Sequence, residues 1–154
     1  HSLPVPLSSG NEVQINFVNL GYKCNIHFLE HIQINLNIDY SRRGNLQIFL
    51  ISPKGSLTML LTLRHKDSYV MGFKNWNFTS VHLWGEDPRG HWRLIVRDPK
   101  NDTQKGKVTK ATLILHGTDK PAGCLRYGPR RYQDEDLISQ TIDRTPVLRV
   151  YSLY

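Results

Sequence analysis

The sequence predicts an all-β protein, an antiparallel β-sandwich or jelly roll of short strands. Apolar and polar residues alternate with a period of two along much of the chain. This pattern places one face of a strand on a core and the other in water. Turn sequences separate the runs roughly every 8 to 15 residues, as is typical of sandwiches. No convincing helical periodicity precedes residue 118.

Six alternating runs are the predicted strands. In chain order they cover residues 13–17, 32–38, 46–50, 57–63, 92–96 and 108–115. Each turn sequence places Pro, which fixes φ, or Gly or Asn, which tolerate left-handed backbone, beside polar residues. These turns are Arg43-Gly44-Asn45, Ser52-Pro53-Lys54-Gly55, Asp87-Pro88-Arg89-Gly90 and Asp98-Pro99-Lys100-Asn101-Asp102. We expect the apolar members of each run, Leu57 and Met59 among them, to face the core.

Charge and cysteine content exclude several protein classes. The 154 residues carry a net charge of +7, which favours an acidic partner but does not specify a fold. Residues 1–118 hold 14 basic and 8 acidic side chains, so they account for +6 of this charge. Only two cysteines, Cys24 and Cys124, are present. They are too few for a disulfide-dense scaffold or a four-cysteine zinc site.

The sequence supports zinc, calcium and nucleic-acid binding less well than simpler interpretations of the same residues. His27 and His31 lie four residues apart, but on a strand this separation spans about 13 Å, too far for one zinc ion. The oxygen-rich turn at 98–102 is a calcium candidate, yet a polar turn with local hydrogen bonds is the simpler interpretation. A basic strip near residues 93–110 resembles no nucleic-acid motif and is expected to be a solvated face, so we predict no nucleic-acid partner. No stretch is long and apolar enough for a membrane span.

Two kinds of processing signal occur. Asn77-Phe78-Thr79 and Asn101-Asp102-Thr103 are N-glycosylation sequons, and the second lies in a predicted exposed turn. Arg130-Arg131 is a paired basic sequence in the tail, and we interpret it either as a cleavage site or as an ordinary basic pair.

The segment 72–92 is the most distinctive part of the chain. It contains Gly72-Phe73-Lys74-Asn75-Trp76 and then Trp84-Gly85-Glu86-Asp87-Pro88-Arg89-Gly90-His91-Trp92. With Leu29-Glu30-His31, the Tyr40–Leu46 block and Leu113–Thr118, it resembles the P domain, or homo B domain, of the subtilisin/kexin-type proprotein convertases. The resemblance covers about residues 11 to 118. The motifs Phe73-Lys74-Asn75-Trp76 and Leu115-His116-Gly117-Thr118 are most similar to those of the neuroendocrine prohormone convertases.

The resemblance implies a jelly roll of about eight strands, with residues 1–10 leading in from a missing upstream domain and an irregular tail over 119–154. It implies a parent protein of the secretory pathway or extracellular space, a calcium-dependent serine endopeptidase that cleaves precursors at paired basic residues. The catalytic triad and the calcium would belong to a subtilisin-like domain upstream, so this chain alone is expected to have no catalytic residue, metal or cofactor. Its implied role is to pack on that domain and stabilise it.

The resemblance also nominates structural and docking residues. Trp76, Trp84 and Trp92 would be core or docking anchors, with the core the favoured place for each. Glu30, Arg42 and Arg43 would form ion pairs or lie in an exposed hairpin. The further candidates share the matched motifs and are Leu29, His31, Gly44, Gly72, Phe73, Glu86, Pro88, Gly90 and Gly117.

The chain departs from the family pattern at two points, and one alternative function remains open. Where many members of the family have Arg-Gly-Asp, this chain has Arg43-Gly44-Asn45, so an integrin-type role is unsupported. The resemblance implies that Cys24 pairs with a cysteine upstream of this chain. The alternative function is a standalone secreted jelly-roll module that binds glycans or acidic peptides, and a different upstream domain would favour it.

Overall fold

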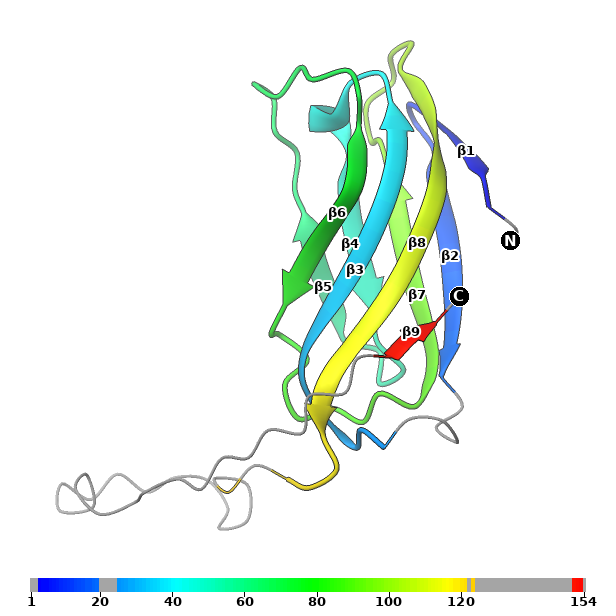
Figure 1. Cartoon of the computed structure of the whole chain (residues 1–154). Helices are drawn as coiled ribbons and strands as arrows, with labels where there is room; N and C mark the ends of the chain where they lie inside the picture. Colours follow the sequence, from blue (N-terminus) through cyan, green and yellow to red (C-terminus); the bar gives the residue numbers. More distant parts are fainter. Residues whose placement is uncertain (1–2, 20–24, 122, 124–150, 154) are drawn as a thin grey trace, which may run out of the picture.

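Two antiparallel sheets pack face to face in the computed structural model, which describes residues 3–19, 25–121, 123 and 151–153 (Figure 1). One sheet has the strand order β1-β8-β3-β6, with β9 also paired to β8, and the other has the order β2-β7-β4-β5. Strands that follow one another along the chain are distributed over both sheets, as in a jelly roll. The predicted all-β sandwich of about eight strands is therefore confirmed.

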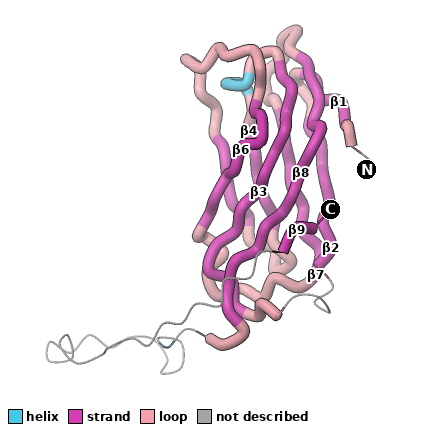
Figure 2. Tube along the Cα trace, viewed as in Figure 1, coloured by secondary structure: helices cyan, strands magenta, loops and turns pink. Residues whose placement is uncertain are grey.

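Nine strands and one short 3-10 helix make up the described chain (Figure 2). The strands are β1 (Val5–Ser8), β2 (Glu12–Asn19), β3 (Phe28–Tyr40), β4 (Gln47–Ile51), β5 (Leu57–Leu61), β6 (Phe73–Ser80), β7 (Gly90–Arg97), β8 (Lys105–Thr118) and β9 (Tyr151–Leu153). The 3-10 helix η1 (Arg43–Asn45) lies between β3 and β4. The two long strands, β3 and β8, pair along most of their length and form the centre of the first sheet.

The core follows the predicted alternation in most strands. Ile32, Ile34 and Leu36 of β3 are fully buried, as are Leu94 and Val96 of β7. Their polar neighbours point to the outer faces of the sheets because successive side chains alternate across a strand. Trp92 is the largest buried side chain, and its indole Nε1 donates a hydrogen bond of 2.9 Å to the carbonyl oxygen of Pro88.

The sandwich begins earlier than the predicted boundary at residue 11. Strand β1 pairs with β8, with Val5 opposite Val108, and Leu7 is buried in the core. Because β1 has only four residues and includes Pro6, its alternation was too short to be recognised. Residues 5–8 are therefore part of the first sheet.

Strand β6 was not predicted, because a bulge interrupts its alternation. Asn75 has a φ of 47°, and the pairing with β3 shifts between Leu36 and Ile38. The core-facing aromatic residues Phe73 and Phe78 are consequently five residues apart instead of an even number. Gly72 just before the strand has a φ of 63°, and a Cβ there would lie 1.9 Å from the carbonyl oxygen of Ile38, so only glycine fits.

Candidate docking surface

Exposed apolar side chains gather on one side of the sandwich. Of the nine large hydrophobic residues exposed in the described part of the chain, eight lie on β5 or within residues 69–84; Val18 of β2 is the other. These eight residues, here called the β5–β6 side, are Leu57, Met59, Tyr69, Val70, Met71, Trp76, Val81 and Trp84. Strands β5 and β6 are edge strands of the two sheets, and they lie along the same side of the molecule (Figure 1). Concentrated exposure of this kind makes the β5–β6 side a candidate interaction surface.

The apolar face of β5 points away from the core, against our prediction. Leu57 is 63% exposed and Met59 52%, whereas Thr58 between them is buried. The pairing of β4 with β5 shifts between Ile48 and Phe49, and a shift of one residue turns each side chain to the other face. The outward apolar face of β5 therefore adds to the exposed surface instead of to the core.

The three tryptophans separate into two groups. Trp92 is in the core as predicted, but the core prediction is wrong for Trp76 and Trp84, which are 49% and 53% exposed. Trp76 lies on the edge strand β6, where no further strand of its sheet covers it, and contacts Phe73 edge to face at 5.7 Å. Trp84 lies in the β6–β7 connection, whose neighbour Leu83 fills the core position. Two tryptophans are thus available as docking anchors.

Two motifs that are far apart in the sequence meet below Trp84. The backbone N–H of Leu29 donates to the carbonyl oxygen of Glu86 at 2.9 Å, and that of Gly85 donates to the carbonyl oxygen of Leu29 at 2.7 Å. Ser56, next to Leu57, donates its hydroxyl to the Glu86 carboxylate. These bonds hold the Trp84 loop beside both β3 and the start of β5.

The predicted glycines and proline support this arrangement. Gly117 is opposite Leu29 on β8, and a Cβ at Gly117 would lie 2.2 Å from the Phe28 carbonyl oxygen. Pro88 provides the carbonyl that accepts the Trp92 indole, and Gly90 begins β7. Their observed contributions are close backbone packing and an acceptor for the Trp92 indole.

At the other end of the β5–β6 side, Arg43 organises the loop that carries Tyr69. Its Nε lies 2.8 Å from Asp67 Oδ2, and its guanidinium lies 4.5 Å from the centre of the Tyr69 ring. Burial raises the pKa of Asp67, but hydrogen bonds from Arg43, the Tyr69 backbone and Arg64 outweigh it and hold the pKa below its ordinary value. The predicted ion pairing of Arg43 is therefore present, and its partner Asp67 was not identified from the sequence.

The other two predicted ion-pairing residues behave differently. Arg42 donates to the carbonyl oxygen of His65 at 3.3 Å, so its partner is a backbone group. Glu30 is half-buried, and no ion pair joins it to another described residue. Gly44, between the arginines and β4, is packed so closely that a Cβ would lie 2.1 Å from the Asp67 carbonyl oxygen.

A buried polar cluster explains the turn at 98–102. Asp98 is fully buried, and its Oδ2 accepts the Tyr40 hydroxyl at 2.7 Å and the Asn45 amide at 3.3 Å. Its Oδ1 accepts the backbone N–H of Lys100 at 2.9 Å. Burial raises the pKa of Tyr40, and the hydrogen bond to Asp98 raises it further. The Asp98 carboxylate thus accepts protein donors, and no cluster of three His, Cys, Asp or Glu side chains suited to a metal occurs in the described ranges.

His31 has a partner that spacing along the chain did not reveal. Its ring stacks on His116 of β8 with a centroid distance of 4.0 Å, and the two residues are opposite each other in the sheet. Both ring nitrogens of His116 are buried without a hydrogen-bond partner. Burial lowers the pKa of His116, nearby His31 lowers it further, and Glu30 raises it. His31 is therefore paired with His116 across the sheet and not with His27 along the chain.

The basic residues do not form one strip. Arg93 and Arg97 are on β7 of one sheet, whereas Lys105, Lys107 and Lys110 are on β8 of the other. Arg97 bonds to Gln47 at 2.9 Å and lies over the Phe49 ring. The sequence neighbours are thus distributed over two sheets.

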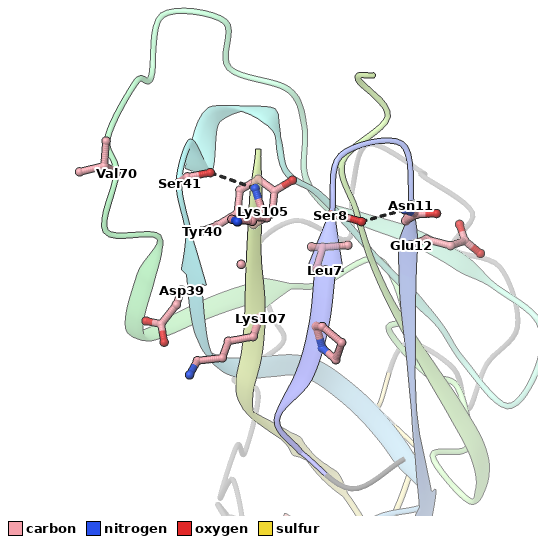
Figure 3. A pocket seen from close by; sticks show the side chains of 12 residues that line it. Leu7, Ser8, Asn11, Glu12, Asp39, Tyr40, Ser41, Val70, Lys105 and Lys107 are labelled. Atoms are coloured by element: carbon pink, nitrogen blue, oxygen red, sulfur yellow. Dashed lines mark hydrogen bonds between the residues drawn. The ribbon is translucent and has the colours of Figure 1, made fainter. Parts of the chain in front are cut away.

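An open pocket of about 820 Å³ lies among β1, β3 and β8 (Figure 3). Lys105 and Lys107 line it, but so do the acidic residues Asp39 and Glu12. Asp39 is already paired with Lys74, and this contact lowers its pKa. Because the lining carries both signs of charge, it has no marked preference for an acidic ligand.

Some predicted sites lie outside the described residues. These are Cys24, Cys124 and the paired basic sequence Arg130-Arg131. Of the two sequons, Asn77 is on the exposed face of β6 and Asn101 is exposed in the β7–β8 turn. In the part of the chain that the structure describes, no helix has the length and hydropathy needed to cross a bilayer.

Comparison with known proteins decides the family. The sequence profile described as "Proprotein convertase P-domain" matches residues 29–115, more than half of the chain. The chain belongs to the proprotein convertase P-domain family. The matched region contains β4 to β7 and most of β3 and β8, and therefore both exposed tryptophans.

Relatives of this P domain are found among several convertases. It is 43% identical to furin of Rattus norvegicus over 99 residues, which are 64% of this chain and 12% of that protein. It is 41% identical to neuroendocrine convertase 2 of Caenorhabditis elegans, also over 99 residues, 64% of this chain and 15% of that protein. Proprotein convertase subtilisin/kexin type 6 of Rattus norvegicus is 44% identical over 95 residues, 59% of this chain and 10% of that protein. The P domain thus spans only a small part of these relatives.

A solved structure supports the fold. The serine protease of Aeromonas sobria, in complex with its chaperone ORF2, matches with a TM-score of 0.60 at 18% identity. The match covers 75% of this chain and 25% of the protease. At this identity, the similarity establishes the β-sandwich and nothing further.

Proposed function

We propose that this chain is a noncatalytic P domain that packs on the subtilisin-like catalytic domain of a serine endopeptidase and stabilises it. The parent protein would be calcium-dependent, with the calcium held by its catalytic domain, and would cleave precursors at paired basic residues. It would act in the secretory pathway or outside the cell. The observation that carries the packing proposal is the concentration of exposed apolar residues on the β5–β6 side.

The apolar surface provides a driving force of useful size. Trp76 and Trp84 are each about half exposed, and a tryptophan presents roughly 200 Å² of surface. Covering both exposed halves removes roughly 200 Å² from water, which contributes about 5 kcal/mol at about 25 cal/mol per Å². Because both domains would belong to one chain, part of the entropic cost of association is avoided.

Charge supports the same partner. The chain has a net charge of +7, and a protease pocket that binds paired basic residues requires acidic groups. A basic neighbour offsets the self-repulsion of such an acidic domain. Burial of apolar surface and complementary charge therefore act in the same direction.

The proposal is tested in the full-length protein that contains this chain. Wild type and the double variant Trp76→Ser/Trp84→Ser are expressed, and hydrolysis of a peptide with paired basic residues is measured after heating at a series of temperatures. We expect wild type to cleave the peptide and the double variant to lose at least 90% of secreted activity or to inactivate at a clearly lower temperature. The same two changes also remove the buried half of each side chain, so urea unfolding of the isolated chain measures this intrinsic cost, and the loss in the full-length protein should exceed it.

Val18→Ser is the matched control. Val18 is 44% exposed but lies on β2, away from the β5–β6 side. This control should keep wild-type activity and heat resistance. A double variant as active and as heat-resistant as wild type would overturn the docking proposal, and the absence of cleavage by wild type would overturn the proposed parent activity.

A further inference from the structure

In the turn between β7 and β8, Asn101 is exposed, while the backbone of its neighbours Lys100 and Asp102 is anchored by hydrogen bonds. We propose that Asn101 carries an N-linked glycan, an inference that rests on the secretory location in the proposed function. Asn101-Asp102-Thr103 is a complete acceptor sequence without proline at its second position. The structural argument concerns how this turn is anchored and what it leaves free.

Ser9 anchors the backbone on both sides of Asn101. Its hydroxyl donates to the carbonyl oxygen of Lys100 at 2.7 Å and accepts the backbone N–H of Asp102 at 3.1 Å. The Asp102 side chain is exposed but anchored, because its Oδ2 accepts the Asn45 amide at 3.1 Å and its Oδ1 accepts the backbone N–H of Gln104 at 2.9 Å. The residues next to Asn101 are therefore held against the sandwich.

Asn101 itself is exposed, and its side chain has no hydrogen-bond partner among the residues that the structure describes. Thr103, the third residue of the acceptor sequence, is exposed as well. A glycan on Asn101 would displace no internal hydrogen bond and bury no polar group. The folded domain is therefore compatible with a bulky polar group at this position.

The second sequon is in a different environment. Asn77 is exposed on β6, but its Oδ1 accepts a hydrogen bond of 2.6 Å from the amide of Asn35, which is largely buried. Its side chain therefore takes part in the pairing of β3 with β6. For this reason the inference is confined to Asn101.

The position of Asn101 is also compatible with the proposed docking. Asn101 follows the end of β7, whereas the Trp84 loop precedes its start. Eight residues of strand span about 25 Å, so the two lie at opposite ends of the sandwich. A glycan at Asn101 therefore leaves the Trp84 loop uncovered.

The reaction requires an oligosaccharide linked to a lipid pyrophosphate as the donor. A bond forms between Asn101 Nδ2 and the anomeric carbon of the sugar, and the bond from that carbon to the pyrophosphate oxygen breaks. The lipid pyrophosphate leaves with the electron pair, and one amide proton is released. No group is oxidised or reduced.

The test uses the full chain expressed in insect cells behind a cleavable secretion leader. Chain from the medium and from the microsomal fraction is treated with peptide N-glycosidase in ¹⁸O-water, and mass spectrometry identifies residue 101. We expect most wild-type chains to show a glycosidase-sensitive mobility shift and ¹⁸O-labelled aspartate in place of Asn101. Asn101→Gln and Thr103→Val should lose the label at this position, while Thr103→Ser, which keeps the acceptor sequence, should retain it.

Asn77→Gln is the comparison variant, and the label at residue 101 should persist in it. Unmodified Asn101 in the wild-type chain from both fractions would overturn the inference, whatever is found at Asn77. Because the leader directs the chain to the secretory pathway, such a result would leave the docking proposal unaffected. Conversely, a labelled Asn101 with an inactive full-length protein would overturn only the proposed parent activity.

Discussion

Replacement of Asn45 by aspartate tests the buried polar cluster beneath η1. Asn45 is 1% exposed, and its amide nitrogen donates to Asp98 Oδ2 at 3.3 Å and to Asp102 Oδ2 at 3.1 Å. Asn45→Asp exchanges this donor for a carboxylate oxygen of nearly the same size. The variant therefore changes charge and hydrogen bonding while leaving the packing almost unaltered.

The magnitude follows from the distance to fully buried Asp98. Two unit charges 3.3 Å apart repel by about 5 kcal/mol at an effective dielectric constant of about 20. The alternative is protonation of the new carboxyl, which costs about 1.4 kcal/mol for each pH unit above its ordinary pKa of about 3.9. At about pH 7.5 this is again about 5 kcal/mol, and at about pH 5.0 it is about 1.5 kcal/mol. A protonated carboxyl also regains one donor, so we expect a loss of about 3–5 kcal/mol at neutral pH and about 1–2 kcal/mol in acid.

The assay is urea unfolding of the full chain at both pH values, comparing variant and wild type at the same pH. The pKa of the new group would be raised by folding, so the destabilisation is present at high pH and is relieved as the pH falls. Asn11→Asp is the control, because Asn11 is exposed and should change stability by less than about 0.5 kcal/mol. A loss that is the same at the two pH values, or below about 1 kcal/mol at neutral pH, would refute the electrostatic reasoning.

Two further predictions concern the core and the histidine pair. Trp92→Phe should lower the free energy of unfolding by roughly 1.5–3 kcal/mol in urea titrations, because it removes buried volume and an indole donor, whereas Trp84→Phe at a half-exposed site should cost less than about 0.5 kcal/mol. Equal effects of the two changes would contradict the burial assignment. The pKa of His116 is lowered by burial, so the folded state binds fewer protons than the unfolded state, and stability should decline as the pH falls through the ordinary histidine range. His116→Phe should reduce this decline in urea midpoints measured between pH 7.5 and 5.0, and His91→Phe, on the exposed face of β7, should not; a decline unchanged by His116→Phe would speak against the linkage.

Strands with uninterrupted alternation were predictable from the sequence. In β7 and in residues 32–38 of β3, alternate residues face the core because the period of side chains in a strand is two. The alternation of β8 is interrupted, since its pairing with β3 shifts between Lys110 and Val108 and its core residues Val108 and Leu113 are five residues apart. Strand β6 was not predictable in this way, since the left-handed residue Asn75 inserts a bulge. The outward phase of β5 was mispredicted because its register against β4 shifts at Phe49, and no local pattern records such a shift.

The candidate docking surface was only partly predictable. The resemblance identified Trp76, Trp84 and Trp92 as important residues, but all three are equally apolar in the sequence. Trp92 is on β7 between two other strands, Trp76 is on the edge strand β6, and Trp84 is in the β6–β7 connection. Their separation into one core residue and two exposed ones therefore depends on the tertiary arrangement. Asp67 was missed because its partner, Arg43, is 24 residues away and the loop between them carries no motif.

The sequence by itself determined the fold class, the family and the identity of the segments that distinguish it. Those properties depend on local alternation, turn chemistry and short motifs, all of which involve residues that are close together in the sequence. The tertiary structure decided which side chains meet and which remain exposed. Strand order and register bring together residues that are distant in the chain. His31 therefore stacks on His116, Asn45 donates a hydrogen bond to Asp98, and the exposed residues of β5 and β6 lie along the same side of the molecule. Surfaces created by such pairing exist only after the sheets have formed, so no single segment of the sequence contains them.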